Sequence, residues 1–338
     1  VPSIANGAMF TAPPQPAVGS YGTSKYVNWL IENMLTYNKT FADKHNVDLL
    51  LGYSTQKTTS ENAKINASDY PDDEVGWFNA ATTKVGEGDR SSWAMISYLA
   101  RANYDYMGKY LLSVSFRRDG CSRFGMNAKW ANFPSVSAGW IVTNEKWVKP
   151  LLKVLDYAKV RASWGQVGNQ NIGDLMFISP ISTSGAYYNF GTALGADGQS
   201  NYYGAYESRL SNENVKWETS EQLDFGLDLR LLGKLNVNID WYKKTTKDWL
   251  LVKPIPGTAG TGAPYFNGGD VENTGIEIGL GWNDNIGRDF NYYVNVNGAY
   301  NKNKVGSIPT SDGIIHGTDG NGQLYDNSTE FYRCSNGE

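Results

Sequence analysis

The chain has 338 residues, a formal net charge of −4 and a mean hydropathy of −0.45. No run of residues approaches the roughly 18 apolar residues of a membrane helix, and no clustered basic footprint indicates a nucleic-acid partner. Aromatic residues make up 13% of the chain, which also holds 37 glycines, and this composition favours β structure with many turns.

Ten strands are predicted from alternating patterns of apolar and polar residues. In chain order they cover residues 26–40, 47–63, 90–106, 109–119, 132–144, 156–168, 215–231, 235–251, 269–284 and 289–305. In the fourth, Tyr110, Leu112, Val114 and Phe116 alternate with residues that are mostly small or polar. The last four strands repeat this pattern, so each has one apolar face and one face of charges, amides and glycines.

The connections between these strands alternate in length. Short turns are predicted at 42–46, 107–108, 232–234 and 283–288, and long segments at 64–89, 170–214, 252–268 and from 306 onward, whereas 120–131 and 145–155 fit less well. Outer-membrane barrels have short periplasmic turns and long extracellular loops, while a soluble sandwich has no reason to sort its loops by length. The pattern therefore favours a transmembrane barrel, whose polar lumen keeps the mean hydropathy low.

Six longer motifs occur in a fixed order over about residues 90–305. They are LLSVSFRRDGCSRFG, KWANFPSVSAGWIVTNEKW, KVRASWGQVGNQNIG, VKWETSEQLDFGLDLRLLGKLNVNIDWYKKTTKDWLL, GGDVENTGIEIGLGWN and NVNGAYNKNKV. Together they resemble the barrel of the SusC/RagA family of TonB-dependent outer-membrane transporters. The stretch before residue 90 fits more loosely, and Cys121 departs from the small hydroxyl residue expected after RRDG.

The resemblance implies an all-β fold, an antiparallel transmembrane β-barrel of about 22 strands filled by a plug. Residues 1–338 would supply about ten of those strands, with the plug domain and the C-terminal strands outside the chain. It also implies TonB-energised uptake of oligosaccharides or peptides through the outer membrane, with a SusD-like surface lipoprotein as partner, TonB acting through the plug region and the lipid bilayer around the wall. The alternative is a soluble secreted β-rich module that binds carbohydrate or cleaves glycans.

The facing of each strand follows from the barrel prediction. Tyr110, Leu112, Val114 and Phe116 are expected to face lipid, and Ser113, Ser115 and Arg117 the lumen. Asp224, Asp228, Asp240 and Glu277 are expected on inward faces of adjacent strands, where they superficially resemble the carboxylate pair of a glycosidase. A wet lumen requires inward polar rows in any case, so no enzyme activity is predicted.

Two histidines and two cysteines lie far apart, at His45, His316, Cys121 and Cys334, without metal-binding or redox spacing. The sequence therefore predicts neither a metal site nor a cofactor.

Two groups are candidate binding residues. Arg117 and Arg118, next to Asp119, could bind an anionic ligand or carboxylates of the plug, although a charged rim that sets loop geometry is the simpler interpretation. The long segment 170–214 holds an aromatic cluster of Tyr187, Tyr188, Phe190, Tyr202, Tyr203 and Tyr206. These side chains could stack on the ligand, contact the partner lipoprotein or pack within the loop, and the sequence does not separate the three.

Overall fold

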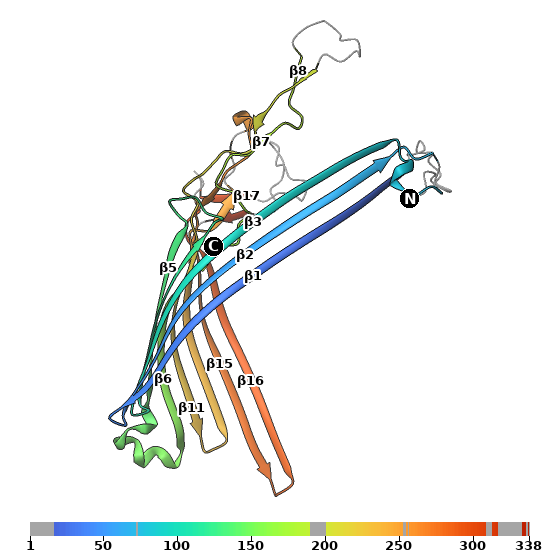
Figure 1. The fold of residues 1–338 in the computed structure, drawn as a ribbon. Helices are drawn as coiled ribbons and strands as arrows, with labels where there is room; N and C mark the ends of the chain where they lie inside the picture. Colours follow the sequence, from blue (N-terminus) through green and yellow to red (C-terminus); the bar gives the residue numbers. More distant parts are fainter. Residues whose placement is uncertain are drawn as a thin grey trace. The chain divides into compact units, whose positions relative to one another are not determined.

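The computed structural model describes residues 17–71, 74–189, 201–252, 255, 257–308, 313–316, 333–335 and 337. Within these residues ten strands form one sheet, in which each strand is hydrogen-bonded to the next along the chain (Figure 1). They are β1 (Val18–Phe41), β2 (His45–Ser68), β3 (Thr83–Tyr106), β4 (Tyr110–Cys121), β5 (Trp130–Ile141), β6 (Leu155–Asn169), β11 (Glu218–Leu231), β12 (Leu235–Lys247), β15 (Val271–Ile286) and β16 (Phe290–Val305). The ladders from β4 to β16 are antiparallel.

Shorter elements occupy the connections. The strands among them form the pairs β7 (Ile181–Ser182) with β10 (Tyr206–Glu207), β8 (Tyr187–Asn189) with β9 (Asn201–Tyr203), β13 (Leu250–Val252) with β14 (Tyr265–Asn267), and β17 (Ile314–His316) with β18 (Arg333–Ser335). The 3₁₀ helices are η1 (Phe78–Ala80), η2 (Val142–Asn144), η3 (Lys146–Lys153) and η4 (Gly257–Ala259). No helix in the described residues is long and apolar enough to cross a membrane.

The chain divides into two compact units. The smaller consists of residues Val1–Ile31 and Thr55–Met95, which include the Val18–Ile31, Thr55–Ser68 and Thr83–Met95 parts of β1, β2 and β3. The larger consists of residues Glu32–Ser54 and Ile96–Glu338, and it contains all of β4 to β16. The candidate site and the segment η3, both described below, lie in this larger unit.

All ten predicted strands are present, but several boundaries differ. β1, β2 and β3 have 24 residues each and extend beyond the predicted ranges into segments that lack apolar alternation. The prediction that residues 142–144 belong to a strand is wrong, because they form the 3₁₀ helix η2. The prediction of a strand through residue 251 is also wrong, since Asp248 has a φ of 58° and Leu250–Val252 pair with β14 instead.

The strand register sorts the side chains of the sheet into alternating rows. One row, from β4 to β16, reads Leu112, Ala138, Ala162, Phe225, Trp241, Ile276 and Tyr300. The next row reads Leu111, Gly139, Arg161, Gly226, Asp240, Glu277 and Ala299. Because neighbouring residues of a strand point to opposite faces, the first row lies on an apolar face and the second on a polar one.

The apolar face is left open to its surroundings. On β4, Tyr110, Leu112, Val114 and Phe116 are 47%, 42%, 46% and 46% exposed, as the predicted alternation requires. The largest fully buried side chains are instead Phe124, Val148, Val215 and Cys121, which lie in connections or at a strand end. In the described part of the chain, no second sheet packs on the apolar face, as one would in a soluble sandwich.

Three buried aromatic side chains, Phe124, Phe133 and Trp217, form a small core at the long-loop end. The Trp217 ring lies 5.1 Å from the Phe124 ring and 5.6 Å from the Phe133 ring, between centroids. Its indole Nε1 donates a hydrogen bond to the Lys129 carbonyl at 3.1 Å. This core joins the connection after β4 to the segment that leads into β11.

Candidate functional site

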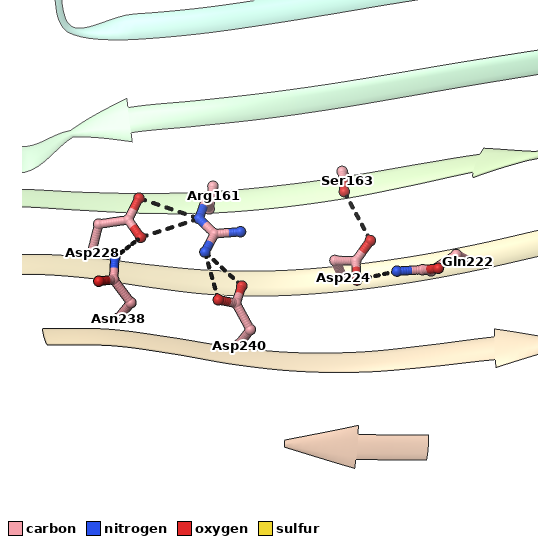
Figure 2. Close-up of polar contacts among 7 residues, drawn as sticks. All are labelled: Arg161, Ser163, Gln222, Asp224, Asp228, Asn238 and Asp240. Atoms are coloured by element: carbon pink, nitrogen blue, oxygen red, sulfur yellow. Dashed lines mark hydrogen bonds and ion pairs between the residues drawn. The ribbon is translucent and has the colours of Figure 1, made fainter. Parts of the chain in front are cut away.

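Arg161 of β6 is the centre of an ionic cluster on the polar face (Figure 2). Its Nε lies 3.2 Å from Asp228 Oδ2, and its Nη2 lies 2.6 Å from Asp240 Oδ1. Asn238 Nδ2 donates a hydrogen bond to Asp228 Oδ1 at 2.9 Å. One guanidinium thus links three adjacent strands, because Asp228 lies on β11 and Asp240 on β12.

Gly226 makes this reach possible. In the ladders it lies between Arg161 and Asp240, so Arg161 must cross it to contact the carboxylate. A Cβ atom at position 226 would lie 2.4 Å from Arg161 Cζ and 2.6 Å from its Nε. The missing side chain at position 226 therefore leaves the space that the guanidinium occupies.

A second set of polar contacts continues from Ser163, two residues along β6. Ser163 Oγ donates a hydrogen bond to Asp224 Oδ2 at 3.1 Å, and Gln222 Nε2 donates one to Asp224 Oδ1 at 2.8 Å (Figure 2). Both interactions hold the Asp224 carboxylate against the polar face.

Polar contacts also cross β2, β3 and β4. Ser113 Oγ donates a hydrogen bond to Asn103 Oδ1 at 2.7 Å, and Asn103 Nδ2 donates one to Asp48 Oδ1 at 3.3 Å. These residues border a hollow of about 670 Å³ whose lining includes Asn38, Asp48, Asn103, Ser113, Arg161, Ser163 and Asp224. The polar groups in this lining can form hydrogen bonds with another polar surface, and Val47, Leu111 and Leu112 add apolar side chains to it.

The four predicted carboxylates do lie on this face. Asp224, Asp228 and Asp240 are held as described, and Glu277 is opposite Asp240 in the ladder between β12 and β15. Two of the four form ion pairs with the Arg161 guanidinium. Because the sheet itself supplies the partner of these two carboxylates, the arrangement is that of an ion-paired wall and not of a free acid pair.

Arg117 and Arg118 have partners within the protein. Arg117 Nε donates to both Asp119 carboxylate oxygens at 2.8 Å, and its Nη2 donates to Ser97 Oγ at 3.2 Å. The Arg118 guanidinium lies 5.2 Å from the centre of the Trp130 ring. These contacts favour the interpretation as a charged rim that sets loop geometry.

The aromatic loop is described only in part. β8 pairs with β9 so that Tyr187 is opposite Tyr203 and Tyr188 is opposite Tyr202. Tyr206 begins β10 and is 43% exposed. Phe190 lies outside the described residues. The pairing brings four of the six predicted aromatic residues together in a single hairpin.

The sequence analysis did not single out Arg161, Gly226 or Asn238. The signal for Arg161 was present, since Val160, Ala162 and Trp164 alternate with Arg161, Ser163 and Gly165. Its two carboxylate partners are 67 and 79 residues away in the chain. Finding them required the register between strands, which the separate patterns do not contain.

A family model described as "TonB dependent receptor-like, beta-barrel" matches residues 5–331 of the chain. Among curated proteins, the chain is 36% identical over 290 residues to TonB-dependent receptor P39 of Formosa agariphila, covering 85% of the chain and 27% of that protein. It is 33% identical over 223 residues to TonB-dependent receptor SusC of Bacteroides thetaiotaomicron, covering 64% of the chain and 21% of SusC. The chain thus spans about a quarter of the length of these relatives.

Solved structures show the same fold. The structure titled "Structure of the RagAB peptide transporter" matches with a TM-score of 0.79 and 23% identity, over 94% of the chain and 34% of that chain. The outer membrane transporter YddB from Escherichia coli matches with a TM-score of 0.55 and 12% identity, over 84% of the chain and 34% of that chain. The resemblance to the SusC/RagA family is thereby confirmed, as is the prediction that the ten strands form part of an antiparallel transmembrane barrel.

Proposed function

The chain belongs to the family of TonB-dependent receptor-like β-barrels, and we propose that the complete protein imports oligosaccharides or peptides through the outer membrane with energy from TonB. The observation that carries the proposal is the family match over residues 5–331, joined to a sheet with one apolar and one polar face. The apolar face suits lipid, and the polar face suits a lumen that a hydrophilic substrate can pass.

The protein is an outer-membrane protein, as its relatives are. The alternative of a soluble secreted module is therefore wrong. Its relatives bear the names of receptors and transporters and not of enzymes, which agrees with the ion-paired state of Asp228 and Asp240.

The proposed partners are a SusD-like surface lipoprotein, and TonB acting through a plug region of the complete protein. The likeness to SusC and to the RagAB transporter supports both. The substrate class stays open between oligosaccharides and peptides. The RagAB transporter is named for peptides, and the name of SusC gives no substrate.

The experiment is uptake by cells that carry the full-length protein. We expect oligosaccharide or peptide uptake to be lost when its gene is deleted, and to be lost equally when TonB is depleted. Pull-down of the full-length protein from detergent extracts should recover a SusD-like surface lipoprotein. Uptake that persists without TonB would contradict the proposed energy source.

We further propose that the aromatic hairpin of residues 185–206 contacts the substrate or the lipoprotein outside the cell. It lies in a long connection, on the side opposite the short turns (Figure 1). Shortening it should leave the assembled barrel intact, because the strands are closed by hydrogen bonds that do not involve the hairpin. The variant should migrate as a heat-resistant folded barrel and lose uptake. Unchanged uptake would remove the hairpin from the mechanism.

A further inference from the structure

The connection between β5 and β6 differs from the other short turns of the sheet. It contains the 3₁₀ helix η3, with the sequence KWVKPLLK, and lies at the short-turn end of the sheet (Figure 1). In outer-membrane barrels the short-turn end faces the periplasm. η3 therefore lies where the barrel wall meets the periplasmic leaflet of the membrane.

η3 buries Val148 and exposes apolar side chains beside it. Val148 is 1% exposed and anchors the helix, whereas Trp147, Leu151 and Leu152 are 63%, 57% and 40% exposed. The Trp147 ring lies 6.4 Å from the ring of Trp140, which belongs to the apolar face of β5. The exposed apolar surface of η3 is thus continuous with the lipid-facing wall.

Three lysines, Lys146, Lys149 and Lys153, accompany this apolar surface, and all are exposed. Within the described residues no carboxylate forms an ion pair with any of them. The acidic residues on either side are engaged elsewhere: Glu145 Oε2 accepts from Lys109 Nζ at 3.0 Å, and Asp156 Oδ2 accepts from the Gly233 backbone N–H at 2.5 Å. The lysines are left with an excess of positive charge next to the membrane.

We propose that η3 binds the headgroups of anionic phospholipids in the periplasmic leaflet. Exposed tryptophan and leucine beside lysine are the composition of interfacial segments, in which the ring and the aliphatic side chains enter the boundary region and the ammonium groups meet phosphate. Each lysine near an anionic surface strengthens binding by roughly fivefold. The segment fixes the depth of this side of the barrel and gathers anionic lipid around it.

The test uses the full-length protein in nanodiscs of phosphatidylcholine mixed with brominated phosphatidylglycerol or with brominated phosphatidylcholine. Bromine quenches nearby tryptophan, and the Trp147 signal is the difference between the parent protein and W147F. We expect phosphatidylglycerol to quench this signal several-fold more strongly than phosphatidylcholine. The preference should disappear in K146Q/K149Q/K153Q and weaken in high salt.

A matched control removes three exposed lysines from the smaller unit, in K25Q/K57Q/K64Q. It lowers the net charge equally and should keep the lipid preference. Equal quenching by the two lipids would overturn the proposal, because it would mean contact without selection for negative charge. No quenching by either lipid would overturn it as well, because η3 would then face water or a periplasmic protein. Both readings are made on the parent protein and W147F, so the proposal stays testable even if the triple variant does not assemble.

Discussion

Arg161 can reach Asp240 only because position 226 carries no side chain. The three residues come from three strands, so the cluster depends on register as well as on residue type. Arginine suits this place because its planar fork can bond two carboxylates at once. A lysine at position 161 would offer a single point charge.

Gly226→Ala is expected to destabilise the barrel by about 1–3 kcal/mol, as overpacking does, because the new methyl group displaces the guanidinium from Asp240. Gly298→Ala is the matched control, since a Cβ atom there would meet nothing within 4 Å. The cost of each substitution is measured as the change in the free energy of unfolding of the full-length protein in bilayers. In an Arg161→Gln background the cost of Gly226→Ala should largely vanish, and an undiminished cost would refute this explanation.

Glu145 joins two connections at the short-turn end, where its Oε1 accepts from Tyr110 Oη at 2.8 Å and its Oε2 from Lys109 Nζ at 3.0 Å. The hydrogen bond from Lys109 is the main cause that lowers the pKa of Glu145, and the bond from Tyr110 adds to it. A lowered folded-state pKa means that the carboxylate stabilises the protein above its unfolded pKa of about 4.3 and loses this effect as the pH falls through the folded value.

Glu145→Gln should therefore lower the melting temperature at about pH 7, and this difference should shrink as the pH falls below the unfolded pKa of about 4.3. The two melting temperatures, of the parent protein and of Glu145→Gln, are measured by heat-dependent electrophoretic migration of the full-length protein between about pH 7 and about pH 3. A gap that is the same at both ends of the range would mean that the charge of Glu145 is not what stabilises the contact.

At the scale of the elements, alternation in the sequence predicts β4 to β16 well, because each strand has a different environment on each face. The same signal is weak in TQKTTSENAKINAS of β2, where polar residues occupy both faces, so the predicted strand ends too early. The predicted ranges of β1 and β3 are too short as well. The strand end at Asp248 was missed for another reason. Its positive φ is a backbone feature that aspartate tolerates but does not require.

Adjacent positions of β4 test the two faces directly. Val114→Arg should destabilise the barrel by about 2–4 kcal/mol, because it places a charge in the lipid. Ser115→Arg should cost far less, since its side chain points into the polar face, where Ser115 Oγ lies 2.6 Å from Ser135 Oγ. Refolding of both variants into bilayers gives the two free energies. Equal costs would indicate a core packed on both faces.

At the scale of the whole molecule, the described strands are a continuous section of a barrel wall and not a self-contained core. β1 and β16 each pair on one side only within the described residues. The apolar face that the sequence predicts is left exposed by the fold, and the polar face carries an ion-paired network of charges and amides. The motifs predict this wall and its family. The ionic cluster and the role of η3 came only from the structure, because they depend on contacts between distant segments.

The most direct test of the account is the facing of a single strand in the membrane. Spin labels at positions 276 to 281 of β15, placed one at a time in the full-length protein with all its native cysteines replaced by serine, report access to dissolved oxygen, which concentrates in lipid. We predict high access at Ile276, Ile278 and Leu280, and low access at Glu277, Gly279 and Gly281. Oxygen access that does not alternate with period two, or that alternates in the opposite phase, would contradict the assignment of this sheet to an outer-membrane barrel wall.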